Sequence, residues 1–131
     1  MKATIWFDGA CSGNPGPMGL GAVVDVEGAK PHILSMAKGH GTNNLAEYHA
    51  LILGLRHALA VGATDIVVHG DSQLILRQLS GQYKVRKAEL APLHAEAAKL
   101  LSRFASHRLE WVPREQNLMA DEASKKAIGL A

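Results

Sequence analysis

Four of the twelve acidic residues occupy positions where simple surface charge is not expected. Asp8 and Asp71 each come directly after a short apolar run, while Glu47 and Asp121 each lie near the start of a segment with helical spacing. Carboxylates gathered in one cleft raise one another's pKa values unless cations hold them. Oxygen ligands without cysteine select Mg²⁺ or Mn²⁺ rather than zinc. Two such ions about 4 Å apart suit in-line attack on a phosphodiester.

Each carboxylate also has a purely structural interpretation, which explains it as well as metal binding does when the residue is taken singly. The structural roles are a capping box with the amide of Asn44 for Glu47, a helix N-cap for Asp71, an i,i+4 ion pair with Lys125 for Asp121, and a turn anchor for Asp8. A common location distinguishes the two interpretations, so the elements that carry the four acids decide between them.

The first forty residues predict three short strands in succession. Runs rich in β-forming residues occupy positions 3–7, 19–26 and 32–38, and turn-forming residues fill the connections 9–17 and 27–31. Three strands with no helix between them indicate an antiparallel meander.

The rest of the chain alternates between helical and strand patterns. The predicted elements are a helix from Leu45 to Leu59 that ends before Gly62, a strand 65–70, a helix 73–79, a long helix 88–106, a strand 109–112 and a final helix 117–128. The β-helix-β units predict right-handed parallel crossovers. The result is an α/β fold with a five-stranded mixed sheet and helices on both faces.

This sheet brings the four acids to one edge. Asp8 and Asp71 are predicted to end neighbouring parallel strands, at the edge where ligand sites of α/β proteins occur. Helices that start at the same edge bring Glu47 and Asp121 there as well. A shared site is therefore favoured over four separate structural roles.

Composition limits the class of protein. The chain has 131 residues, 47% of them hydrophobic and 20% charged, which fits one domain over residues 1–131 and excludes a fibrous repeat. No apolar run approaches the roughly 20 residues of a membrane span, and the run 3–7 is too short for a signal peptide. Cys11 is the single cysteine, which excludes a disulfide framework, and we expect a cytoplasmic protein. A net charge of +2 does not by itself indicate nucleic acid.

Four blocks of sequence match a known family. They are FDGACSGNPGP at residues 7–17, TNNLAEY at 42–48, GDSQ at 70–73, and WVPREQN at 111–117 followed by ADEA at 120–123. With these blocks, and with its acids in the order Asp, Glu, Asp, Asp, the chain resembles a type 1 ribonuclease H (ribonuclease HI family) over nearly its whole length. The resemblance implies a ribonuclease H-like fold whose first three strands are antiparallel and whose last two are parallel.

The resemblance also implies an activity, which is endonucleolytic hydrolysis of the RNA strand of RNA–DNA hybrids to give 5′-phosphate and 3′-hydroxyl ends. It implies two Mg²⁺ ions per site, with Mn²⁺ able to substitute. Carried over by position, Asp8 bridges the ions, Glu47 and Asp71 hold the ion near the leaving oxygen, and Asp121 holds the ion that activates water. This division of work is chemically sensible for phosphodiester hydrolysis. The partner is the hybrid, and neither a membrane nor an obligate protein partner is implied.

Substrate contacts are implied for a second set of positions. The hybrid differs from DNA duplex in its 2′-hydroxyls and minor-groove shape, which a short polar surface can recognise. The implied contacts are the backbone of the loop that includes Gly9, Cys11 and Ser12, base or sugar edges for Asn14, Asn44 and Gln73, and a phosphate or its sugar for Thr42 and Asn43. Helix capping is the structural alternative for Asn43 and Asn44.

The sequence departs from the family pattern in two places. Many members carry a histidine between the last strand and the last helix, whereas the shortened segment here has none and offers Arg114, Glu115 or Gln116 as substitutes. Many bacterial members also insert a basic helix that grips the DNA strand, whereas residues 81–87 lead directly to one long helix. The small basic cluster in that segment predicts modest, strongly salt-dependent hybrid binding, with an ordinary solvated loop as the alternative.

Three other functions compete with this one. The fold recurs in non-catalytic nucleic-acid binders, and related nucleases cleave RNA duplex or RNA–DNA junctions. A P-loop or dinucleotide site is excluded, because neither glycine-rich segment completes the required motif.

Trp6 and Trp111, both in predicted strands, are expected in the core.

Overall fold

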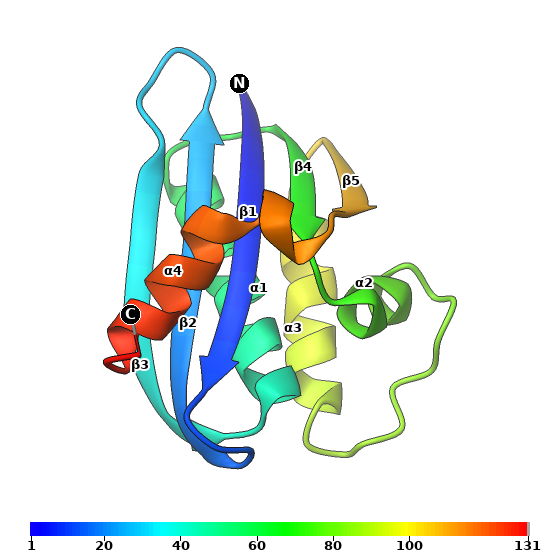
Figure 1. Cartoon of the computed structure of the whole chain (residues 1–131). Helices are drawn as coiled ribbons and strands as arrows, with labels where there is room; N and C mark the ends of the chain where they lie inside the picture. The colour runs from blue at the N-terminus through cyan, green and yellow to red at the C-terminus, as the bar shows by residue number, and fades with distance from the viewer. Residues whose placement is uncertain (131) are drawn as a thin grey trace.

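A five-stranded mixed sheet with the strand order β3-β2-β1-β4-β5 runs through the molecule (Figure 1). The structure is a computed structural model that describes residues 1–130. Its elements are β1 Lys2–Cys11, β2 Gly16–Val26, β3 His32–Gly41, α1 Asn43–Ala60, β4 Asp65–Gly70, α2 Gln73–Leu79, α3 Ala91–Leu101, β5 Ser106–Trp111, the 3-10 helix η1 Arg114–Gln116, and α4 Leu118–Ala127.

The sheet has the predicted topology. β1 pairs antiparallel with β2, and β2 pairs antiparallel with β3. β4 pairs parallel with both β1 and β5. The expected α/β fold class, with three antiparallel strands followed by two parallel ones, is therefore confirmed.

Helices cover both faces of the sheet. α1 and α3 lie on one face, while α4 crosses β1, β2 and β3 on the other (Figure 1). The alternate residues Ala3, Ile5 and Phe7 of β1 are buried in one apolar cluster with Leu51 and Leu55 of α1. This core holds β1 and α1 together, and both elements carry residues of the predicted site. Among the described residues, no helix combines the length and the apolar character needed to cross a bilayer.

Several predicted boundaries were wrong, and strand pairing explains why. β1 runs on to Cys11 and β2 begins at Gly16, so the predicted loop 9–17 shrinks to four residues. Antiparallel pairs such as Gly9 with Leu20 continue the ladder through glycine-rich sequence. The helix predicted over 88–106 covers only Ala91–Leu101. Its last predicted residue, Ser106, instead pairs with Asp65 as the first residue of β5.

The two tryptophans are less buried than expected. Trp111 is 50% exposed, so its predicted core position was wrong. Trp6 is half-buried and stacks on His69 with ring centroids 5.3 Å apart. Trp111 lies on β5, which stands at the edge of the sheet, and an edge strand buries less of its side chains than a central one.

Gly21 allows α4 to approach the sheet closely. A Cβ at Gly21 would lie 2.1 Å from the backbone oxygen of Ala120 and 2.6 Å from the backbone nitrogen of Ser124. These are helix backbone atoms that cannot rotate away. The absence of a side chain at Gly21 thus sets the depth at which α4, and with it Asp121, packs on the sheet.

We predict that Gly21→Ala lowers the free energy of unfolding by at least about 2 kcal/mol, the upper part of the range for overpacked sites. Chemical denaturation measures the loss. Gly39→Ala is the control, because its added Cβ would have no neighbour within 4 Å in residues 1–130 and carries only the cost of a positive φ, about 1 kcal/mol. Equal losses in the two variants would contradict the close approach of α4.

Candidate metal and active site

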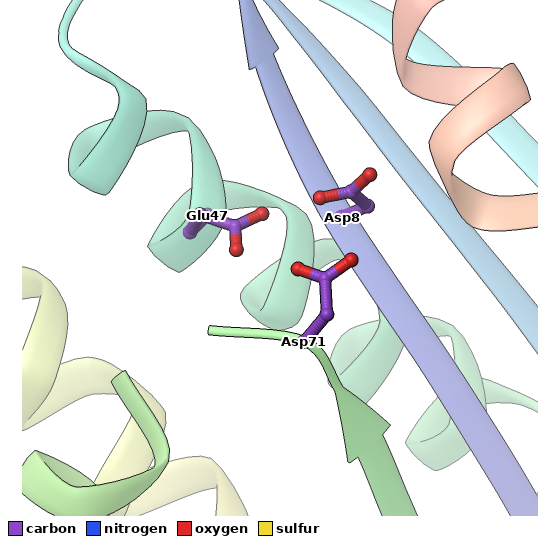
Figure 2. A group of neighbouring side chains, drawn as sticks. All are labelled: Asp8, Glu47 and Asp71. Atoms are coloured by element: carbon purple, nitrogen blue, oxygen red, sulfur yellow. The ribbon is translucent and has the colours of Figure 1, made fainter. Parts of the chain in front are cut away.

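The parallel register of β1 and β4 brings two acids side by side. Phe7 of β1 pairs with Gly70 of β4, so the residues that follow this pair are Asp8 and Asp71. Oxygen atoms of Asp8, Glu47 and Asp71 all lie within 4.8 Å of one another (Figure 2). Asp8 lies inside β1 rather than at its end as predicted, because the strand continues on its other edge with β2.

Glu47 reaches this point because α1 packs directly on β1. A Cβ at Gly9 would lie 2.4 Å from the backbone nitrogen of Glu47, so only glycine permits the contact. The backbone N–H of Gly9 donates a hydrogen bond to Glu47 Oε1. Thr42 caps the helix instead, with its Oγ1 accepting from the backbone N–H of Leu45 at 3.3 Å. The capping-box interpretation of Glu47 is therefore wrong.

Asp71 is likewise not the helix cap that its position allowed. Ser72 caps α2, with its Oγ accepting from the backbone N–H of Ile75 at 3.3 Å. The carboxylate of Asp71 remains available to the cluster, and the indole Nε1 of Trp111 donates to its backbone oxygen at 3.2 Å.

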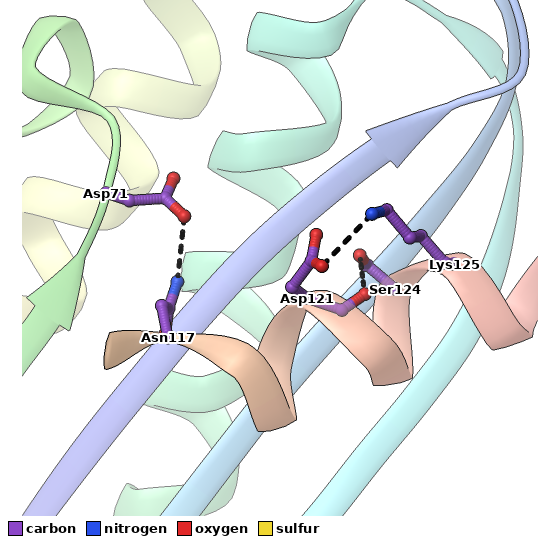
Figure 3. Close-up of polar contacts among 5 residues, drawn as sticks. All are labelled: Asp71, Asn117, Asp121, Ser124 and Lys125. Carbon is purple, nitrogen blue, oxygen red and sulfur yellow. Dashed lines mark hydrogen bonds and ion pairs between the residues drawn. The ribbon is translucent and has the colours of Figure 1, made fainter. Parts of the chain in front are cut away.

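Asp121 faces the same cleft from α4. Its carboxylate makes the i,i+4 ion pair with Lys125 Nζ at 3.1 Å, as the structural interpretation predicted (Figure 3). It nevertheless lines one cleft of about 390 Å³ together with Asp8, Glu47 and Asp71. The four predicted carboxylates therefore meet, with three of them tightly grouped and Asp121 held toward Lys125.

The electrostatics of Asp8 and Glu47 are those of crowded, desolvated acids. Their exposed fractions are 6% and 7%. Burial raises the pKa of Asp8 strongly, and the neighbouring charges of Glu47 and Asp71 raise it further. Burial also raises the pKa of Glu47, although hydrogen bonds from Asp8 and Gly9 oppose the shift.

Asp121 behaves differently because it has cations beside it. Burial opposes ionisation of Asp121, but hydrogen bonding with Asp8 and the proximity of Lys125 and Arg114 outweigh it and lower the pKa. The cleft thus holds one acid with a lowered pKa on α4 and two acids with raised pKa values, one on β1 and one on α1.

This donor set fits divalent cations. The oxygens of Asp8, Glu47 and Asp71 are hard ligands, the type that Mg²⁺ and Mn²⁺ prefer. A bound cation would remove the repulsion that raises the pKa values of Asp8 and Glu47.

The predicted substrate-contact residues are divided between the cleft and its surroundings. Gly9, Cys11, Asn43 and Asn44 line the cleft. The remaining positions lie outside its lining: Ser12 and Gln73 are exposed, Thr42 caps α1, and Asn14 Oδ1 accepts from the backbone N–H of Asn43 at 3.1 Å. Because Thr42 is the cap, the side chains of Asn43 and Asn44 are not needed for that role.

The loop before α4 offers one of its three predicted substitutes to the cleft. Arg114 lines the cleft. Glu115 and Gln116 line a different groove, beside Trp6 and Leu118. The 3-10 turn η1 sends consecutive side chains in different directions, which residue type alone does not reveal.

One polar residue near the cleft has a position that the sequence analysis missed. Asn117 is 2% exposed, and its Nδ2 lies 3.4 Å from Asp71 Oδ2 (Figure 3). Its place just before the last helix suggests a cap, but its side chain makes no cap hydrogen bond. The contact therefore has no local signal in the sequence.

Comparison with known proteins gives consistent matches. A family model described as "Reverse transcriptase-like" matches residues 6–127. The ribonuclease HI of Halobacterium salinarum is 39% identical over 97% of this chain and 64% of its own length. The bifunctional protein Rv2228c of Mycobacterium tuberculosis is 42% identical over the whole chain, which spans only 36% of that relative. A ribonuclease H of Moorella thermoacetica is 33% identical over 97% of this chain and 91% of its own length.

Solved structures match equally well. The RNase H1 crystal structure from Halobacterium salinarum superposes with a TM-score of 0.95 at 36% identity and covers 100% of both chains. The N-terminal RNase H domain of Rv2228c gives a TM-score of 0.92 at 42% identity, over 98% of this chain and 94% of that one. LC11-RNase H1, solved in complex with RNA/DNA hybrid, gives 0.89 at 36% identity, over 97% of this chain and 96% of that one.

The raised pKa values predict how stability depends on pH when metal is removed. Because Asp8 and Glu47 have higher pKa values folded than unfolded, the folded chain binds more protons between the two values. Their contribution is therefore complete below the unfolded pKa values and is lost as the pH rises through the folded ones. Burial raises the pKa of Glu47 from 4.5 to about 7. We therefore expect the thermal unfolding midpoint in EDTA to fall as the pH rises over this range.

Asp8→Asn should reduce this fall and leave metal-free stability at pH 7 unchanged or higher. Asp25→Asn on β2, outside the cleft, is the matched control and should keep the wild-type profile. Substantial destabilisation by Asp8→Asn in EDTA would instead assign this carboxylate a structural role.

Proposed function

The chain belongs to the type 1 ribonuclease H family, and from this membership we propose that it is an endonuclease that hydrolyses the RNA strand of RNA–DNA hybrids. The observation that carries the proposal is the group of Asp8, Glu47 and Asp71, two of them buried and the third half-buried, whose oxygens lie within 4.8 Å of one another. The relatives named ribonuclease H and the neighbour solved with RNA/DNA hybrid support the same substrate class. Residues 1–131 act in this proposal as one ribonuclease H domain.

In this proposal Asp8, Glu47, Asp71 and Asp121 hold two divalent cations, Mg²⁺ with Mn²⁺ able to replace it. When bound, such cations would lower the pKa of an attacking water and neutralise charge on the departing 3′-oxygen. Hydrolysis at that bond would leave 5′-phosphate and 3′-hydroxyl ends. Asp8 is the residue best placed to be shared between two cation positions. Its pKa is raised by Glu47 and Asp71 and also by a hydrogen bond with Asp121, so all three other acids are close to it.

The two cationic side chains of the cleft both act on Asp121. Lys125 holds the Asp121 carboxylate in an ion pair, and Arg114 adds positive charge near it. A cation that binds Asp121 must share or displace Lys125. Because Arg114 alone of the three loop candidates lines the cleft, we assign to it any role that the missing histidine has in relatives.

The hybrid extends beyond the cleft over a basic groove. Asn44 lines both the cleft and this groove, whose other lining residues include Lys84, Arg86 and Lys87. The guanidinium of Arg77 lies 5.2 Å from the centre of the Tyr83 ring and donates to its hydroxyl, which orders the start of the basic segment. This continuity supports phosphate contacts by the basic cluster while Gly9, Cys11 and Asn43 face the strand to be cut.

The proposed activity is tested with labelled RNA–DNA hybrid, RNA duplex, DNA duplex and single-stranded RNA, each with Mg²⁺, Mn²⁺ or EDTA. We expect cleavage of hybrid RNA alone, and only with metal. Asp8→Asn should lower the rate on the order of a thousandfold or more, because several kcal/mol of charge stabilisation depend on the cations. Asp25→Asn is the control. Cleavage in EDTA or full activity of Asp8→Asn would refute the proposal, and cleavage of RNA duplex would support the broader nuclease.

Binding tests the basic groove separately from cleavage. With Ca²⁺ in place of Mg²⁺, hybrid affinity should fall steeply with salt, and Lys84→Ala and Lys87→Ala should each reduce the slope of log K against log[salt] by about one. Lys30→Ala in the β2–β3 turn is the control, because it lies outside both grooves. An unchanged slope in both variants would show that these lysines are ordinary solvated side chains.

A further inference from the structure

Asn117 is a buried amide whose hydrogen bonds join two parts of the cleft. Its Nδ2 donates to the backbone oxygen of Phe7 at 2.9 Å. The same nitrogen lies 3.4 Å from Asp71 Oδ2 (Figure 3). Phe7 directly precedes Asp8, and it is the last residue of β1 that pairs with β4. Asn117 therefore links β1 to the residue that follows β4, at the end of the β1–β4 ladder.

The orientation of the Asn117 amide follows from its partners. A backbone carbonyl and a carboxylate only accept hydrogen bonds, so the nitrogen must face them and the oxygen must point elsewhere. Within residues 1–130 the buried Oδ1 has no hydrogen-bond partner. An unpaired buried acceptor costs about 1–3 kcal/mol, so maximal stability does not explain this residue.

Asn117 can orient Asp71 without neutralising it. A donor on one carboxylate oxygen restricts rotation of the group, so its remaining lone pairs keep one direction relative to Asp8. Lys125, by contrast, places a positive charge on Asp121 and competes with any cation there. The Asn117 amide beside Asp71 is uncharged, so the full negative charge of the Asp71 carboxylate stays available to a metal ion.

We propose that Asn117 is a positioning residue, which holds the Asp71 carboxylate against the β1 backbone so that Asp8 and Asp71 bind a divalent cation together. The inference rests on the proposed function, because it assumes that these acids are metal ligands. Asn117 itself does not touch the metal or the hybrid in this account. Groups that orient metal ligands typically change affinity by about 10- to 100-fold when removed.

The test is calorimetric titration of the full chain with Mn²⁺ alone, at pH 7 and well below the unfolding midpoint of each variant. We expect Asn117→Ala to weaken Mn²⁺ binding by about 10- to 100-fold. Asn117→Ser, which stays polar but is too short to span Phe7 and Asp71, should do the same. In an Asp71→Asn background, Asn117→Ala should cost far less affinity, because the carboxylate that it orients is gone.

Ser124→Ala, on the helix α4 that follows Asn117, is the matched control. Ser124 is fully buried and its hydroxyl donates to the backbone oxygen of Asp121 at 2.7 Å, but it makes no bond to Asp71. It should lose stability without a loss of Mn²⁺ affinity. Wild-type affinity in both Asn117 variants, or an equal loss in the Asp71→Asn background, would overturn the inference. A wild-type chain that binds no Mn²⁺ would instead overturn the proposed metal site.

Discussion

The structure depends on the parallel pairing of β1 with β4, which places two carboxylates next to each other at the end of a shared ladder. Because Phe7 pairs with Gly70 in parallel register, the residues that follow them, Asp8 and Asp71, are neighbours. α1 then adds Glu47 to the pair over the backbone of Gly9. Mutual repulsion in so small a volume is tolerable when protons or cations compensate it. The fold therefore favours the binding of protons or cations at these carboxylates even without substrate.

Close packing of helices on the sheet makes this arrangement possible. Gly9 admits the first turns of α1 and Gly21 admits α4, and in each case a methyl group would overlap helix backbone. The two helices approach from opposite faces and deliver Glu47 and Asp121 to one cleft. The apolar core between α1 and the sheet stabilises the fold and offsets the repulsion among the carboxylates.

The sequence predicted the order and type of the elements well, because apolar runs and helical spacing are local signals. It also predicted that the four acids meet, although Asp8 lies within β1 and not at its end. It missed what depends on pairing. Glycine-rich sequence around Asp8 became strand because β2 lies beside it, and Trp111 is half exposed because β5 is an edge strand. The bond from Asn117 to Asp71 joins residues 46 apart, so no local pattern announces it.

The central claim, that these carboxylates grip a pair of divalent ions, is tested most directly by a crystal structure of the chain with hybrid and Ca²⁺. We expect two ions about 4 Å apart, with oxygens of Asp8 bound to both and Glu47, Asp71 and Asp121 completing the ligand set. Hybrid seated on the cleft with no ion between Asp8 and Asp71, or ions bound only elsewhere on the molecule, would contradict it.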